Sequence, residues 1–230
     1  MRKFIKNAMA CVFSIFMLFV SACKPENVEE SGDGTIKDTD IVLAENGKTD
    51  YVAVIPAQAT EAEKYAAELL QKQFFEATGA TLPLKSDEGN TFTESEKVIS
   101  IGRTSILEAS GLDVTVDELT YEGYKLQQHG NTMLLCGAED SGTIYSVGDF
   151  LHYHFGYEVY AVDEIYIEQT DKVYLKALDI VEIPDFWGRD MDGYFASSAR
   201  LNSALRMRTS NLPESMGFGS SRDWLPNAHH

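Results

Sequence analysis

The chain has 230 residues, which is enough for one large or two small domains. Hydrophobic residues make up 44% of it and charged residues 24%, the ordinary balance of a globular protein, so disorder over most of the chain is excluded. Acids outnumber bases by 36 to 19, for a formal net charge of −17, and so acidic a body repels phosphate backbones, which excludes nucleic acid as a partner.

A basic start and an apolar run open the chain. Three basic residues among the first six precede the run from Ala8 to Val20, which is too short to span a bilayer, since a span needs about 20 residues. The run ends in Val20-Ser21-Ala22-Cys23 and resembles the bacterial lipobox, in which small residues precede the cysteine that is lipidated. Residues 1–22 are therefore predicted to be a lipoprotein signal peptide and Cys23 the lipidated residue. An ordinary secretory signal with a chance cysteine is the alternative.

Residues 23–40 are rich in acids and contain no apolar periodicity. They are predicted to be a solvated acidic tether. An acidic stretch directly after a lipidated cysteine is similar to the surface-export signals of Bacteroidota lipoproteins. This similarity implies a location in the outer membrane or at the cell surface, with the periplasmic face as the alternative.

Residues 41–183 show the short apolar runs and turn signals of a folded domain. Strands are predicted at 41–44, 51–55, 98–101, 124–129, 132–136, 158–160, 165–168 and 173–177. The first two surround a hairpin-like turn at 45–48, and Gly130-Asn131 gives the second hairpin signal.

Two main helices are predicted at 60–78 and 141–155, each with one apolar face. Thr60 and Glu63 have the spacing of a capping box, and Gly79 stands where a helix-ending glycine belongs. Hairpin strands mixed with two helices predict an α+β fold, namely a two-layer sandwich of a mixed or antiparallel sheet with two main helices.

Residues 184–230 contain one strand-like and one helix-like segment, which cannot bury their apolar faces alone. They are predicted to be the incomplete start of a (β/α)₈ barrel, which needs roughly 200–250 residues, or a tail.

Residues 60–190 resemble the small α+β domain that precedes the catalytic barrel in bacterial glycoside hydrolases. The matching segments are AAELLQKQFFEATGATLPL (66–84), VISIGRT (98–104), GYKLQQHGNTMLLCGAEDSGTIYSVGDFLHYHFGYEVYA (123–161) and IPDFWGRD (183–190). Their order and spacing are similar to those of the α-glucuronidase N-terminal domain, the second domain of β-hexosaminidases, and Bacteroidota lipoproteins with an uncharacterised barrel. The resemblance implies that the catalytic carboxylates lie on later barrel strands, so no residue of this chain is assigned a catalytic role. The chain is either a fragment of a longer reading frame or a free-standing accessory domain.

The resemblance also implies that the first barrel strand can supply a substrate-binding arginine, which makes Arg189 a candidate sugar contact. Arg189 equally suits a structural network with its neighbouring aspartates, and Trp187 suits either a sugar ring or a barrel core. His152 and His154 are two residues apart on a helix and face different sides, so they are predicted to be surface and packing residues. Cys136 is predicted to be an inert buried thiol. No metal or cofactor is expected.

The leading hypothesis is an N-terminal accessory domain of a surface-anchored glycoside hydrolase-like lipoprotein that takes part in polysaccharide degradation and is not itself catalytic. The alternative is a non-catalytic carbohydrate-binding surface lipoprotein, and a third is a purely structural or interaction domain. The expected partners are a polysaccharide or oligosaccharide and, through the lipid, a membrane.

Overall fold

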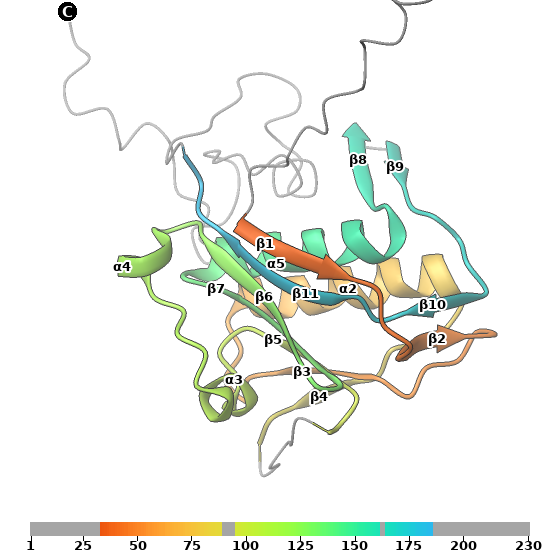
Figure 1. Cartoon of the computed structure of the whole chain (residues 1–230), viewed down its shortest axis with the longest axis horizontal. Coiled ribbons are helices and arrows are strands. Elements are labelled where there is room, and N and C mark those ends of the chain that lie inside the picture. The colour runs from red at the N-terminus through yellow and green to blue at the C-terminus, as the bar shows by residue number, and fades with distance from the viewer. Residues whose placement is uncertain (1–32, 89–94, 162–163, 186–230) are drawn as a thin grey trace, which may run out of the picture. The chain divides into compact units, whose positions relative to one another are not determined.

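The computed structural model describes residues 33–88, 95–161 and 164–185. The chain divides into two units, Met1–Ser31 and Gly32–His230, and every described residue belongs to the second (Figure 1). Its elements are β1 (Asp33–Lys37), β2 (Val42–Glu45), β3 (Val52–Ile55), α2 (Glu61–Thr78), β4 (Leu84–Ser86), β5 (Val98–Ile101), α3 (Ser105–Ser110), α4 (Val116–Leu119), β6 (Tyr124–His129), β7 (Thr132–Gly137), α5 (Asp140–Phe155), β8 (Glu158–Ala161), β9 (Glu164–Tyr166), β10 (Lys172–Tyr174) and β11 (Ala177–Glu182). Within the described ranges, no helix is both long and apolar enough to cross a bilayer.

Seven strands form one mixed sheet in the order β1-β11-β6-β7-β5-β3-β4. Neighbouring strands are parallel in the β7-β5-β3-β4 part of the sheet and antiparallel in the β1-β11-β6-β7 part. The strand β7 therefore has one parallel and one antiparallel neighbour. Parallel neighbours need a crossover connection, which α2 supplies after β3, while the tight turn at Gly130 joins β6 directly to β7. The predicted α+β class with a mixed sheet is confirmed. Two further pairs, β2 with β10 and β8 with β9, stand outside this sheet.

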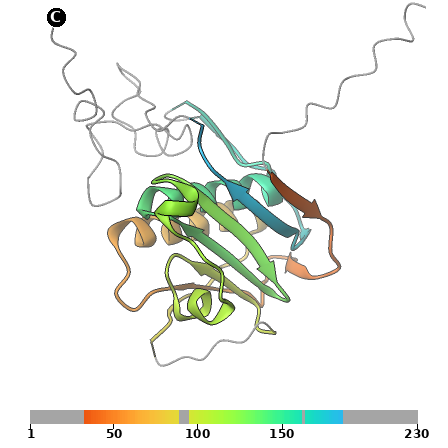
Figure 2. The same cartoon turned by 60° about the vertical axis from the view of Figure 1, so that its left-hand side comes forward.

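Side chains alternate between the two faces of the sheet, as the pleat of a strand requires. On β7, Met133 and Leu135 belong to the core under α2 and α5, whereas Leu134 and Cys136 belong to a smaller core with α3 and α4. Figure 2 shows the two long helices on one face of the sheet and the short α3 on the other. The two-layer sandwich is thus formed by the main sheet with α2 and α5, and among the described residues α3 and α4 cover part of the opposite face.

The ends of α2 are determined by local hydrogen bonds, as the sequence predicts. The Glu63 backbone N–H donates to Thr60 Oγ1 at 3.2 Å, and the Thr60 backbone N–H donates to Glu63 Oε2 at 2.9 Å. Gly79 ends the helix in the left-handed conformation, with φ 69°. The capping box and the terminal glycine are both confirmed.

The predicted tether is wrong in its last part, because residues 33–37 form β1 at the edge of the sheet. β1 pairs with β11, with Asp33 opposite Val181 and Lys37 opposite Ala177. A Cβ on Gly34 would lie 2.9 Å from the carbonyl oxygen of Asp179, so the close approach of the two backbones depends on glycine. These five residues, DGTIK, carry one acid and one base within an acidic stretch, and they join an available strand edge.

Two further predictions about the strands differ from the structure. The turn at 45–48 is present, with Asn46 and Gly47 at φ 53° and 71°, but β2 and β3 do not pair with each other. Instead, β2 pairs with β10 and β3 lies in the main sheet. The predicted strand at 173–177 is divided between β10 and β11, because the chain passes from one sheet to the other there.

Candidate functional site

Polar side chains gather in two places, of which the first is the carboxyl edge of the parallel strands. Ligands commonly bind at this edge in open α/β sheets. Here the Asp87 carboxylate accepts hydrogen bonds from the backbone N–H groups of Ala57 at 2.7 Å and Ser105 at 2.8 Å. Asp87 therefore joins the loops that follow β3 and β5.

Glu63 and Arg103 strengthen the same edge. Glu63 is buried, and its Oε1 accepts a hydrogen bond at 3.0 Å from the backbone N–H of Arg103. The Arg103 guanidinium donates through Nη2 to the carbonyl oxygens of Val114 at 2.9 Å and Ala138 at 2.7 Å. Gly102 has φ 78°, and a Cβ there would lie 2.0 Å from Glu63 Oε1. Glu63 and Arg103 hold these loops together, and their hydrogen-bonding groups are used for this purpose.

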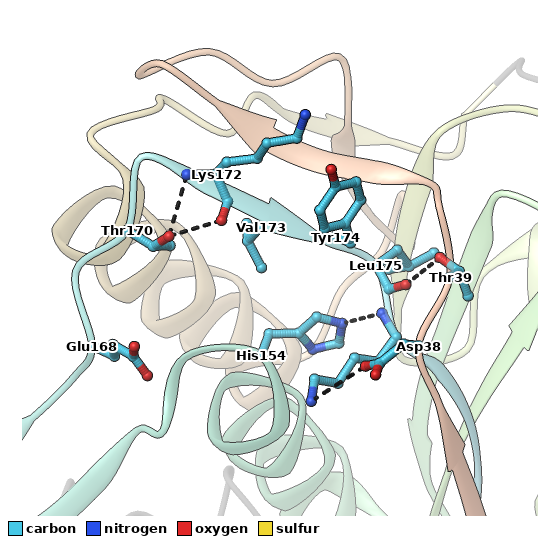
Figure 3. A pocket seen from close by; sticks show the side chains of 10 residues that line it. Asp38, Thr39, His154, Glu168, Thr170, Lys172, Val173, Tyr174 and Leu175 are labelled. Atoms are coloured by element: carbon cyan, nitrogen blue, oxygen red, sulfur yellow. Dashed lines mark hydrogen bonds and ion pairs between the residues drawn. The ribbon is translucent and has the colours of Figure 1, made fainter.

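The second place is a pocket of about 250 Å³ beside α5 (Figure 3). Its walls come from Asp38 and Thr39 after β1, from His154 on α5, and from the segment between Glu168 and Lys176. Thr39 Oγ1 donates to the carbonyl oxygen of Leu175, which ties two walls together. The pocket therefore joins parts of the chain that are more than a hundred residues apart.

His154 forms the floor of the pocket (Figure 3). Its Nδ1 lies 2.8 Å from the carbonyl oxygen of Phe150, and its Nε2 accepts the backbone N–H of Lys176 at 3.0 Å. A carbonyl only accepts, so the proton is on Nδ1 and both ring nitrogens are used. Burial lowers the pKa of His154 to about 4, which keeps the ring neutral. The predicted packing role of His154 is confirmed.

The charged walls of the pocket differ in how firmly they are held. Lys172 Nζ lies 2.8 Å from Glu45 Oε1 and 5.0 Å from the centroid of the Tyr174 ring. Hydrogen bonds to Glu45 and Tyr174 raise the pKa of Lys172. Lys176 Nζ lies 4.0 Å from Asp38 Oδ1, the limit of an ion pair. Glu168 has no hydrogen-bonding or ionic partner for its carboxylate among the described residues.

The structure also describes the side chains of Cys136 and His152. Cys136 is buried, and burial raises the pKa of its thiol to about 12, so the predicted inert thiol is confirmed. His152 Nδ1 lies 2.9 Å from Glu158 Oε1 at the surface. The described residues contain no group of three histidine, cysteine or acidic side chains arranged to hold a metal ion.

The predicted site residues Cys23, Trp187 and Arg189 lie outside the described residues. The pocket was not predicted. Its one sequence signal is the alternation in β10, where exposed Lys172 and Tyr174 flank buried Val173. No local pattern indicates that Asp38 or Glu168 lies beside them.

No family model matches this chain, and no curated protein matches it either. Among solved structures, that of CpGH84D, a family 84 glycoside hydrolase, is similar with a TM-score of 0.43 and 15% sequence identity. The match covers 70% of this chain and 24% of CpGH84D, so this chain spans about a quarter of that protein.

Proposed function

We propose that this chain is the N-terminal accessory domain of a surface-anchored glycoside hydrolase-like lipoprotein that takes part in polysaccharide degradation. The observation that carries the proposal is the pairing of the first and last strands of the described unit. Asp33 lies opposite Val181, so the chain enters β1 and leaves β11 at the same end of two adjacent strands. This arrangement suits a domain placed between an anchor and a following part of the protein.

The state of the polar groups supports a role without catalysis for the described domain. Glycoside cleavage uses two carboxyl groups about 5–10 Å apart on either side of the scissile bond. At the carboxyl edge of the sheet, Glu63 and Asp87 are both engaged by backbone N–H groups, and at the pocket floor His154 has no nitrogen left for a substrate. The polysaccharide-cleaving acids belong, in this proposal, to a barrel that follows residue 184.

The anchor is assigned to Cys23. Nine residues lie between Cys23 and Asp33, and the fully extended chain from one to the other reaches about 35 Å at most. A lipid on Cys23 would therefore keep the start of β1 within about 35 Å of the membrane surface. Cys23→Ala is expected to leave the precursor unprocessed and to move the protein out of the detergent phase in a partitioning assay. A variant that still partitions into detergent after membrane washing contradicts the anchor.

Sequencing the gene past codon 230 tests the accessory role. We expect a continuing frame with alternating strands and helices and paired acids at strand ends. A stop codon with no barrel nearby contradicts it. We also expect the chain itself to hydrolyse no aryl glycoside above background, and turnover that survives repurification contradicts that.

A non-catalytic carbohydrate-binding lipoprotein is the second candidate, and the pocket beside His154 favours it. Affinity electrophoresis against a panel of polysaccharides separates the two candidates. Retardation of the chain supports direct carbohydrate binding whether or not a barrel follows. Absence of retardation on every glycan leaves only the accessory role.

A further inference from the structure

The paired strands β8 and β9 form a small ribbon whose back is packed on the core. Val159 of β8 is buried and lies opposite Ile165 of β9, which is partly buried against the main core. Figure 1 shows the two strands standing clear of the main sheet, next to the end of α5. A two-stranded hairpin alone is marginally stable in water, so this packing is what holds the ribbon in place.

The front of the ribbon presents two exposed tyrosines. Side chains alternate along a strand, so the residues next to Val159 and Ile165 face away from the core. Tyr160 is 65% exposed and Tyr166 is 53% exposed, which places both rings on this outer face although the register shifts by one residue after Val159. Glu158 lies opposite Tyr166, so Tyr160, two residues further along β8, is the diagonal neighbour of Tyr166. Diagonal neighbours are about 7–8 Å apart, and the two tyrosines therefore form one surface.

Both rings are available to a ligand. Neither Tyr160 nor Tyr166 has a hydrogen bond or a ring contact among the described residues. A Cβ on Gly156 would lie 3.8 Å from Cε1 of Tyr166, so this ring rests against the end of α5 and the rest of its surface is open. Single apolar side chains are scattered over every protein surface, whereas adjacent ones mark an interaction site.

The charges on the same face narrow the class of partner. Glu158 Oε1 lies 2.9 Å from His152 Nδ1, and exposed Glu164 has no partner among the described residues. An anionic glycan meets these carboxylates and a net charge of −17, so it is repelled. A basic protein segment finds one carboxylate without a partner, and an exposed ion pair contributes only about 0–1 kcal/mol. A neutral sugar ring packs its apolar face on a tyrosine ring and donates from its hydroxyl groups to a carboxylate at the edge.

We propose that the front of the β8–β9 ribbon binds a neutral polysaccharide, with two neighbouring sugar units packed on Tyr160 and Tyr166. The carboxylate of Glu164 accepts hydrogen bonds from the hydroxyl groups of the glycan. The proposal rests on the carbohydrate-related function proposed above and assigns it a surface. This surface is separate from the pocket beside His154, since no residue of β8 or β9 lines that pocket.

Binding is measured by affinity electrophoresis of the full chain in native gels that contain a detergent without a sugar headgroup. The probes are galactomannan, glucomannan, mixed-linkage β-glucan and dextran, with polygalacturonate as the anionic comparison. We expect at least one neutral glycan to retard the chain and polygalacturonate to leave its migration unchanged. An oligosaccharide of the retarding glycan should compete and its free monosaccharide should not, because the two tyrosines engage two sugar units.

Matched variants locate the surface. Tyr160→Ala and Tyr166→Ala are each expected to weaken binding about tenfold. Tyr174→Ala, which removes an exposed tyrosine of β10 outside the ribbon, should leave binding unchanged. Tyr160→Phe and Tyr166→Phe keep the rings and should retain most of the binding, which separates loss of an aromatic ring from loss of folding.

The outcomes are distinct. A neutral glycan whose retardation depends on both tyrosines supports the proposal, and dependence on only one of them overturns the two-unit arrangement. Retardation that neither alanine variant changes, or a preference for polygalacturonate, overturns the surface or its ligand class and leaves the carbohydrate function standing. If no glycan retards the chain, the surface and the carbohydrate-binding candidate fail together, while the accessory role is still decided by the gene sequence.

A labelled lysine-rich peptide, followed by fluorescence anisotropy, tests the competing class of partner. We expect no binding of this peptide that depends on Tyr160 or Tyr166. Binding that both alanine variants abolish, in a chain that no glycan retards, would assign the surface to a basic protein segment and overturn the sugar.

Discussion

The carboxyl edge of the parallel strands and the pocket beside His154 are both polar, but their side chains are used differently. At the strand edge, Glu63 accepts from two backbone N–H groups and Arg103 donates to two carbonyl oxygens. At the pocket rim, Glu168 has no such partner among the described residues and Lys176 has one distant carboxylate. A conventional ligand-binding edge of a sheet can thus serve stability, while side chains without partners among the described residues lie elsewhere.

The largest expected effect is that of Gly102→Ala at the strand edge. The alanine must adopt the left-handed backbone conformation, which costs about 1–2 kcal/mol. Its Cβ must also displace Glu63 from its hydrogen bonds, which costs about 1–2 kcal/mol more. We expect urea unfolding to show a loss of about 3 kcal/mol. Gly111→Ala is the control, since Gly111 has φ 71° but no atom within 4 Å of its Cβ position. Equal losses for the two variants would contradict the role of Glu63.

The pocket floor is expected to make stability depend on pH. The pKa of His154 is about 4 in the folded chain and about 6.5 when the chain is unfolded, so the unfolded state binds more protons between these values. The contribution of the neutral His154 ring to the free energy of unfolding is therefore complete above pH 6.5. It is lost as the pH falls towards 4, and about 2 kcal/mol of the free energy of unfolding is lost at pH 5. Denaturant unfolding from pH 7 to 4.5 measures it. His154→Gln should flatten this slope, whereas His152→Gln should not.

A matched pair of cation replacements compares the two regions directly. Arg103→Met leaves the carbonyl oxygens of Val114 and Ala138 without their donor, and we expect a loss of about 1.5 kcal/mol. Lys176→Met keeps the backbone N–H that His154 accepts and removes only a weak ion pair, so we expect a change within about 0.5 kcal/mol. Thermal or urea unfolding of both variants measures the two losses in the free energy of unfolding. A larger loss at Lys176 would reverse the comparison.

The smallest effect is expected for Glu168→Gln. The side chain is exposed and unengaged among the described residues, so the free energy of unfolding should stay within about 0.5 kcal/mol of the original. A clear loss of stability would mean that Glu168 has a structural partner.

Local chemistry predicted much of the fold. The capping box at Thr60 and Glu63 and the glycine at position 79 predicted both ends of α2, because each signal acts over three or four residues. Gly130-Asn131 predicted the β6–β7 hairpin for the same reason, with His129 paired to Thr132. The strand predicted at 132–136 is present as β7, whose residues are all buried and alternate between two cores.

Partners distant in sequence were not predictable in this way. Residues 33–37 belong to a stretch, 23–40, that was predicted to be a tether, yet β11 offers them an edge and Gly34 allows the approach. The strands β2 and β3 are joined by a hairpin-like turn, yet each pairs elsewhere. Strand partners depend on which edge is open in the folded sheet, and no short stretch of sequence contains that information.

The amino-acid sequence alone establishes the acidic charge and the lipobox-like segment ending at Cys23, and it predicts the helix caps, the β6–β7 turn and the α+β class. The folded chain is needed to show that Asp38, His154 and Tyr174 line one pocket, and that Glu63 and Arg103 join loops while Glu168 does not. The difference comes from the distance along the sequence between the residues that interact. A cap or a turn is completed by hydrogen bonds within a few residues, whereas a pocket wall exists only after strands distant in sequence have paired.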